Sequence, residues 1–248
     1  MTAANNWYRR LGDALSLSAL FGGVSKKPTV ILLATPLILT TWKYYGTKAF
    51  YLSDLASVFV LFGNAEQTAE LYTFFSAFIL FALVPWAIVR FVFKESMSAY
   101  GLQLGDWRFG LKAFLILAPI FVLASYTSIN DPSFLAEYPL YKGAGASPSI
   151  FLGHSLAYLF FYIGWETYFR GFMQIGLRDA FGDWNSILVQ TALSCIIHIG
   201  KPAGEIYSSI IGALVWGVLV FRTKSIFWGL LIHWLLGVSL DFFICYAR

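Results

Sequence analysis

Long apolar stretches separated by short polar ones run through almost the whole of this 248-residue chain. A helix needs roughly 17 to 25 predominantly apolar residues to cross a bilayer, and by that measure the sequence predicts about seven spans. They cover residues 29–45, 71–89, 113–129, 150–177, 184–199, 206–221 and 225–246. We therefore expect an all-α, polytopic membrane helix bundle, with an N-terminal segment 1–28 and a single membrane domain 29–248.

Two apolar segments do not fit this scheme. Residues 55–63 are too short to cross, so we expect a re-entrant or interfacial piece, or an extension of a neighbouring helix. Residues 5–21 fit an amphipathic helix on the membrane surface, or equally a solvated leader. The first 28 residues lack the uninterrupted apolar core and cleavage site of a secretory signal peptide.

Composition and charge place the protein in a membrane. Only 12% of the residues are charged, whereas soluble domains carry about 25%. Lys and Arg gather before the first predicted span and in the second-to-third, fourth-to-fifth and sixth-to-seventh connections. The positive-inside rule then puts the N-terminus in the cytoplasm and the C-terminus outside. We expect a multi-pass protein of a prokaryotic cytoplasmic membrane, and the net charge of +4 gives no reason to invoke nucleic acid.

Five polar side chains inside the predicted spans are candidates for chemistry: Glu166, Arg170, His198, His233 and Asp241. An unpaired charge in a membrane costs several kcal/mol, so such groups pair, face water or act chemically. At 1.5 Å per residue, Glu166 and His198 come to roughly 16 and 21 Å from the cytoplasmic surface, and His233 and Asp241 to roughly 12 and 24 Å. All can therefore meet near mid-membrane.

Each of these residues also has a purely structural interpretation. Glu166 and Arg170 form a possible i, i+4 ion pair, and a single membrane histidine is often satisfied by a neighbouring hydroxyl. His233, Gly237 and Asp241 share one helix face, where Gly237 leaves either a notch for water or substrate or a close helix contact. His154 is expected at the outer interface.

The residue types fit three chemistries. A carboxylate and a histidine can activate water for hydrolysis while a second histidine stabilises the oxyanion. Two histidines and two carboxylates can bind a divalent metal such as zinc. The same groups can relay protons in a transporter. The spacing alone does not choose among these possibilities.

Three short motifs then resemble signatures of one family. The run Glu166-Thr167-Tyr168-Phe169-Arg170-Gly171 resembles a Glu-Glu-x-x-x-Arg-Gly signature, Ser194 to His198 stands where the family has Phe-x-x-x-His, and His233 to Gly237 where it has His-x-x-x-Asn or Asp. Over about residues 98–246 the chain resembles the CAAX protease and bacteriocin-processing (CPBP, or Abi) family of intramembrane endopeptidases.

The resemblance implies a helical bundle with a cavity open to the cytoplasm, where a glutamate and a histidine activate water to cut a peptide. Residue by residue, Glu166 matches the second family glutamate and Arg170 the arginine. His198 matches the water-activating histidine and His233 the histidine on the oxyanion side. The resemblance also implies a protein or peptide substrate at the membrane. It implies no cofactor, although older descriptions of the family as metalloproteases leave a divalent metal open.

The chain departs from the family pattern at two positions that matter. Trp165 stands where the family has its first, catalytic glutamate, and Gly237 where it has Asn or Asp. Moving a carboxylate one residue along a helix turns it by about 100°. Glu166 or Asp241 is expected to take over as base. Glu205, just past the Gly200 and Pro202 that end the fifth span, is a further candidate unless it lies in a solvated turn near Lys201.

The sequence thus predicts an intramembrane endopeptidase in which a Glu/His pair activates water. One alternative is a catalytically silent family member that binds a peptide or partner protein, as in immunity or sorting. The other is a proton-coupled transporter.

Overall fold

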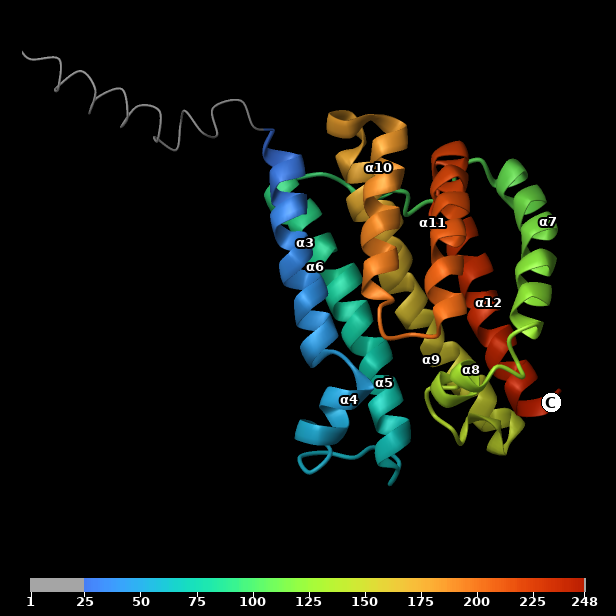
Figure 1. Ribbon diagram of the computed structural model, residues 1–248. Helices are drawn as coiled ribbons and strands as arrows, with labels where there is room; N and C mark the ends of the chain where they lie inside the picture. The colour runs from blue at the N-terminus through green and yellow to red at the C-terminus, as the bar shows by residue number, and fades with distance from the viewer. Residues whose placement is uncertain (1–24, 248) are drawn as a thin grey trace, which may run out of the picture.

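The computed structural model describes residues 25–247, and the segment 5–21 therefore lies outside the described residues. Helices dominate, and their bounds are α3 (Lys26–Tyr45), α4 (Lys48–Phe50), η1 (Tyr51–Leu55), α5 (Ala65–Phe78), η2 (Ile79–Leu83), α6 (Val84–Ala87), η3 (Ile88–Phe93), η4 (Met97–Tyr100), α7 (Trp107–Tyr126), α8 (Pro132–Glu137), η5 (Ala144–Ala146), α9 (Pro148–Glu166), η6 (Thr167–Ile175), α10 (Gly176–Ile197), α11 (Ala203–Thr223) and α12 (Phe227–Tyr246). The long helices stand side by side as a bundle (Figure 1). The all-α prediction is confirmed over the described residues.

Four helices among the described residues are long and apolar enough to cross a membrane: Ala65–Phe93, Trp107–Tyr126, Ala203–Thr223 and Phe227–Tyr246. The first unites α5, η2, α6 and η3 in one helix of 29 residues, with wide π turns on both sides of Pro85. The remaining predicted spans are also helical, in α3, in α9 with η6, and in α10. Whether these three cross the membrane stays a prediction.

The fourth and fifth predicted spans meet at a sharp reversal inside α10. Gly182 has φ 75° and ψ 171°, a conformation that breaks the helix and that glycine tolerates. Arg178 donates to the Asp183 carboxylate from Nε (2.6 Å) and Nη2 (3.0 Å) across this turn. The chain then runs back through the bundle, and α10 ends at Ile197, well short of the far end in Figure 1.

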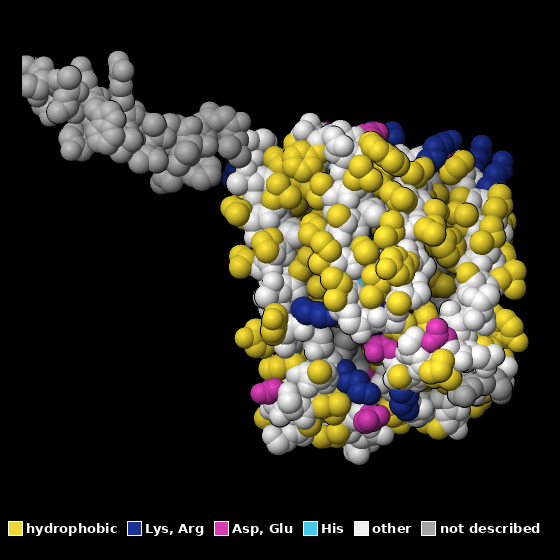
Figure 2. Space-filling model, viewed as in Figure 1, with side chains coloured by type: hydrophobic (Ala, Val, Ile, Leu, Met, Phe, Trp, Pro, Cys, Tyr) yellow, Lys and Arg dark blue, Asp and Glu magenta, His cyan; other side chains and the backbone are white. Residues whose placement is uncertain are grey.

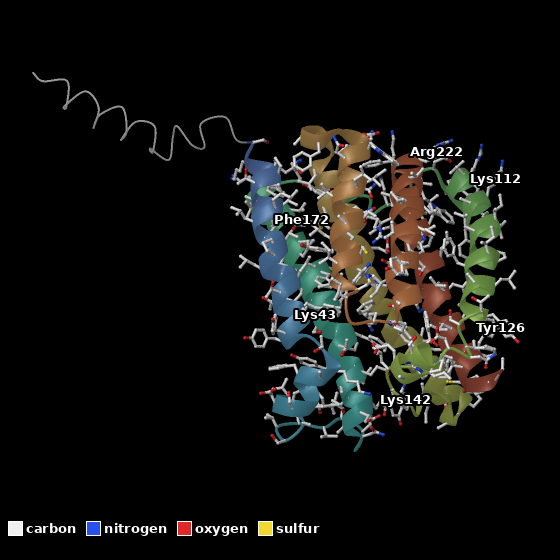
Figure 3. All side chains as sticks on the ribbon, in the orientation of Figure 1. Lys43, Lys112, Tyr126, Lys142, Phe172 and Arg222 are labelled. Carbon is white, nitrogen blue, oxygen red and sulfur yellow. The ribbon has the colours of Figure 1, made fainter. Side chains whose placement is uncertain are left out.

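Basic side chains gather at one end of the bundle, which we call the basic end. It carries the α10 turn, the α11–α12 loop and the start of α7, with Lys112 and Arg222 labelled in Figure 3. Asp106 ties this end together because its carboxylate accepts from the Phe109 backbone N–H (3.1 Å) and from Arg222 Nη1 (3.0 Å). The opposite end, with α4, α8 and the C-terminus, we call the α8 end. Hydrophobic side chains cover much of the flank between them (Figure 2).

An aromatic core locks α9 against its neighbours. Trp165 packs on Phe161 (ring centroids 5.4 Å apart), and Trp42 reaches Trp165 from α3 at 6.2 Å. A side chain at Gly164 would lie 2.7 Å from the Ala77 carbonyl oxygen, so glycine is needed for α9 to approach α5 this closely. The core therefore fixes the rotation of α9 at the point where the first motif begins.

The short apolar segment 55–63 does not cross the bundle. It forms turns and a loop at the α8 end after η1, with Val58 72% and Phe62 78% exposed. This placement agrees with an interfacial piece. Its apolar exposure is that of a segment placed at a bilayer surface.

Candidate active site

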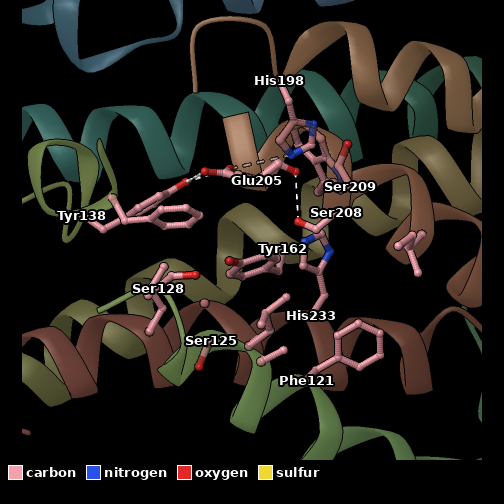
Figure 4. Close-up of a pocket in the computed structure, with 18 of the residues that line it drawn as sticks. Phe121, Ser125, Ser128, Tyr138, Tyr162, His198, Glu205, Ser208, Ser209 and His233 are labelled. Carbon is pink, nitrogen blue, oxygen red and sulfur yellow. Dashed lines mark hydrogen bonds and ion pairs between the residues drawn. The ribbon is translucent and has the colours of Figure 1, made fainter. Parts of the chain in front are cut away.

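A cavity of about 490 Å³ lies between α7, α9, α11 and α12. Both histidines of the second and third motifs line it, together with Trp165, Arg170, Tyr162 and Glu205. In Figure 4, His198 and His233 enter the same space from different helices, and Glu205 lies between His198 and Tyr138. The structure therefore brings the two predicted histidines together.

The cavity occupies the half of the bundle nearer the α8 end. Its lining includes Ser128 beyond the end of α7, Tyr138 at the end of α8, and the exposed Ser208 in the first turns of α11. The positive-inside rule assigns the opposite, basic end to the cytoplasm. The family resemblance predicts a cavity that opens to the cytoplasm, but the cavity lies nearer the α8 end. The two predictions therefore disagree with each other on this structure.

His198 caps the C-terminus of α10 and presents one defined ring nitrogen to the cavity. Its Nδ1 lies 2.5 Å from the Ser194 carbonyl oxygen. A carbonyl only accepts, so Nδ1 carries the hydrogen, and in the neutral ring Nε2 is an acceptor. This nitrogen lies 3.9 Å from Oε1 of Glu205. The separation is too long for a direct hydrogen bond.

His233 is held from behind by Glu166. Its Nδ1 is 2.7 Å from Oε1 of Glu166, and its ring stacks on Trp216 with centroids 4.4 Å apart. Glu166 is fully buried and is not among the residues that line the cavity. Because the carboxylate accepts the Nδ1 hydrogen, the other nitrogen of His233 is left to interact with a molecule in the cavity.

Arg170 completes this buried group. Its Nε lies 3.4 Å from Oε2 of Glu166, and its guanidinium packs 5.5 Å from the Trp216 ring centroid. The predicted i, i+4 pair is therefore present, but Arg170 also lines the cavity, and its Nε and Nη1 have no hydrogen-bond partner among the described residues. Buried donors of this kind are costly unless something accepts from them.

Trp165 lines the cavity where the resembling family has a carboxylate. Only 3% of the residue is exposed, and its ring meets His198 edge-on with centroids 5.2 Å apart. Phe169 packs on its other side at 4.7 Å. The indole thus walls the cavity and orients His198, and it supplies no base.

Gly237 makes room for a tyrosine. A Cβ built on Gly237 would overlap the hydroxyl of Tyr162, which lines the cavity from α9. The Tyr162 ring also packs on His233 with centroids 4.6 Å apart. The notch is therefore occupied by a phenol, and the sequence offered no signal for it because α9 and α12 are far apart in the chain.

Asp241 is not part of this group. Its Oδ2 lies 2.8 Å from Nε2 of His154, whose Nδ1 lies 2.8 Å from Oε1 of Glu70. All three side chains are buried, and Asp241 and His154 are not among the cavity-lining residues. His154 was expected at the interface, and it is instead the centre of a buried pair of hydrogen bonds. Asp241 is therefore paired with His154 and does not line the cavity.

Glu205 is the carboxylate that lines the cavity within the described part of the chain. The Tyr138 hydroxyl lies 2.8 Å from Oε1 and 2.9 Å from Oε2 of this carboxylate. Burial, and then the negative charge of Glu205, raise the pKa of Tyr138 well above its ordinary value, so the hydroxyl stays protonated and donates. Lys201 pairs with Glu137 instead. Glu205 is therefore held at the site and is not a solvated turn residue.

The donor set gives a poor fit to a metal. Among residues 25–247, no group of three or more His, Cys, Asp or Glu side chains is placed to hold a metal ion. His233 is committed to Glu166, and Asp241 to His154. We therefore derive no chemical step through a metal.

Comparison with known proteins gives one match. Residues 147–239 match the family model described as type II CAAX prenyl endopeptidase Rce1-like. No curated protein and no solved structure matches the chain. The matched stretch begins at the residue before α9 and ends within α12, so it contains all of the motif residues that meet at the cavity.

Proposed function

We propose that this chain, of which residues 147–239 match the model of type II CAAX prenyl endopeptidase Rce1-like proteins, is an intramembrane endopeptidase that activates water with a carboxylate and His198. Its substrate is a protein or peptide at the membrane. One observation carries the proposal: the cavity has hydrogen-bond acceptors on one wall and donors on the other. Peptide hydrolysis requires both, because water must lose a proton while the carbonyl oxygen gains negative charge.

The acceptor wall is formed by Nε2 of His198 and the Glu205 carboxylate, 3.9 Å apart. Two acceptors at this separation cannot bond to each other, but one water can donate to both. Such a water keeps its lone pairs directed into the cavity, where a peptide carbonyl carbon can be attacked. The Ser194 carbonyl keeps the ring of His198 in the tautomer that this arrangement needs.

The donor wall is formed by Arg170 and by the protonated form of His233, since Nε2 of the neutral ring accepts when Nδ1 donates to Glu166. Glu166 fixes the ring of His233 and would stabilise the charge of its protonated form, while Arg170 lines the same cavity. A donor aimed at a developing oxyanion is worth about 10²- to 10³-fold in rate. Glu166 acts through His233, so its proposed role is that of a positioning residue.

A second candidate function is peptide or partner binding without hydrolysis. The observation in its favour is Trp165, which fills the position of the first family glutamate with an indole. A cavity that offers hydrogen bonds to a peptide but has no general base would bind the peptide and release it unchanged.

Cleavage by the reconstituted protein tests the proposal. The full chain in phosphatidylethanolamine/phosphatidylglycerol vesicles is incubated with a defined peptide library that includes farnesylated CAAX peptides, and new termini are read by mass spectrometry. We expect cleavage by the wild type and at least about 100-fold slower cleavage by His198→Ala and by His233→Ala. Tyr207→Ala, at a 72%-exposed position on α11, is the control expected to stay active.

Two results would decide against hydrolysis. If the wild type and His198→Ala yield identical peptides, no His198-dependent hydrolysis takes place. If both proteins also retain the same peptides on the vesicles, binding without hydrolysis is the better description. Thermal unfolding of each variant in detergent excludes loss of fold as the reason for lost cleavage.

A further inference from the structure

We infer that Glu205 is the general base of this site, in place of the carboxylate that Trp165 has replaced. This inference rests on the proposed endopeptidase function. It concerns a residue outside all three motifs, in the first turn of α11.

The other two carboxylates considered for this role are committed elsewhere. Glu166 is 0% exposed, contacts His233 and Arg170, and does not line the cavity. Asp241 is 0% exposed and bonds to His154. A general base must reach the proton that it takes, directly or through one water. Neither carboxylate meets that condition for a substrate in the cavity.

Glu205 meets it. Its side chain lines the cavity, keeps 21% exposure and has Oε1 3.9 Å from the acceptor nitrogen of His198. The single hydrogen of the Tyr138 hydroxyl can serve one carboxylate oxygen at a time, so the other oxygen remains free to accept from water. Lys201 is engaged with Glu137, so it does not neutralise Glu205 by direct pairing.

The turn between α10 and α11 explains how a residue so near His198 in sequence reaches it in space. Gly200 adopts φ 102°, which reverses the chain, and Pro202 precedes the first helical residue of α11. The first turn of α11 is thereby placed beside the end of α10. A helix N-terminus also interacts favourably with a carboxylate in its first turn.

The chemical step balances with the groups present. Water donates one hydrogen bond to His198 and another to Glu205. Its oxygen then attacks the peptide carbonyl carbon, and the proton that it shared with Glu205 passes to that carboxylate. The carbonyl π electrons move to the oxygen, which His233 and Arg170 stabilise. The carbon–nitrogen bond then breaks, the nitrogen takes the proton back from Glu205, and a new carboxyl group and a new amine leave.

Glu205→Gln tests the assignment against Glu137→Gln, which makes the same chemical change one helix away on a carboxylate that pairs with Lys201 and does not line the cavity. We expect kcat to fall by about 10²- to 10⁴-fold in Glu205→Gln and to stay within about threefold of wild type in Glu137→Gln. Tyr138→Phe should fall in between, because it keeps the base and loses only its hydrogen-bonded support.

Glu205→Asp guards against a simple folding defect. It keeps the carboxylate and moves it by one carbon, so it should retain more activity than Glu205→Gln at equal thermal stability. If Glu205→Gln cleaves within threefold of wild type while His198→Ala is inactive, the assignment is wrong and the endopeptidase function stands. If the wild type and His198→Ala give the same products, the function itself fails, and the role of Glu205 fails with it.

Discussion

Replacing Glu166 with glutamine isolates the charge of the buried Glu166–Arg170–His233 group. Glutamine keeps the size of the side chain, and its carbonyl can still accept from Nδ1 of His233. What is lost is the negative charge 3.4 Å from Nε of Arg170, in a place where both side chains are at most 1% exposed. At an effective dielectric constant of about 20, that attraction amounts to about 5 kcal/mol.

The net effect should be close to this figure because the remaining guanidinium stays buried. Removing one partner of a buried pair costs about 3 to 5 kcal/mol. For a chain of this size, that corresponds to a fall in melting temperature of about 10 °C. Glu66→Gln is the matched control, since Glu66 is 54% exposed and lies 3.8 Å from Lys48. Exposed pairs are worth about 0 to 1 kcal/mol, so the control should barely move.

Thermal unfolding of the purified protein in detergent measures the change. The double variant Glu166→Gln/Arg170→Met should be more stable than Glu166→Gln alone, because it removes the stranded charge. A melting temperature for Glu166→Gln within 2 °C of wild type, or two substitutions whose effects simply add, would refute the reasoning. The cleavage assay with the same proteins should show rate recovery for neither variant, since both release His233 from its charged partner.

Three other predictions concern the rest of the bundle. His154→Ala leaves the buried carboxylates of Glu70 and Asp241 without the histidine between them and should destabilise the protein by about 3 kcal/mol. The value of kcat for the folded fraction should not fall. Thermal unfolding and cleavage measured on the same sample distinguish the two effects. Gly237→Ala should cost about 1 to 3 kcal/mol by displacing the Tyr162 hydroxyl, and adding Tyr162→Phe should recover part of the loss; equal melting temperatures for Gly237→Ala and wild type would contradict the packing argument. If the basic end is cytoplasmic, Ser208→Cys at the cavity should react, above the background of the parent chain, with an impermeant maleimide added outside intact cells, whereas Lys112→Cys should not; the opposite labelling pattern would place the cavity mouth in the cytoplasm.

Much of the architecture was predictable because bilayer thickness and backbone hydrogen bonding leave few choices. The seven predicted apolar stretches are all largely helical, and the connection between the predicted spans 150–177 and 184–199 contains the reversal at Gly182. The helices begin and end several residues away from the predicted limits where polar residues continue the helix, as in Ala65–Phe93. Segment 55–63, which is too short to cross, forms turns and a loop at the α8 end.

The candidate site was predictable only in part. Depth along a helix is readable from residue spacing, and the depths of His198 and His233 correctly suggested that they share a cavity. The direction in which a side chain points around its helix is harder to predict, because each residue along the helix turns that direction by about 100°. For that reason Asp241, at a suitable depth, was grouped with His233 although it faces His154.

What the sequence by itself determined is the class of protein and the identity of its reactive groups: a multi-helix membrane bundle with a carboxylate, an arginine and two histidines in three ordered motifs. Local composition suffices for this because hydrophobic length and motif spacing are properties of single helices. Only the tertiary structure decided that Glu166 supports His233 from behind, that Tyr162 fills the space above Gly237, and that Glu205 faces His198. Those relations depend on how helices distant in sequence are rotated against one another, and packing of the whole core sets that rotation.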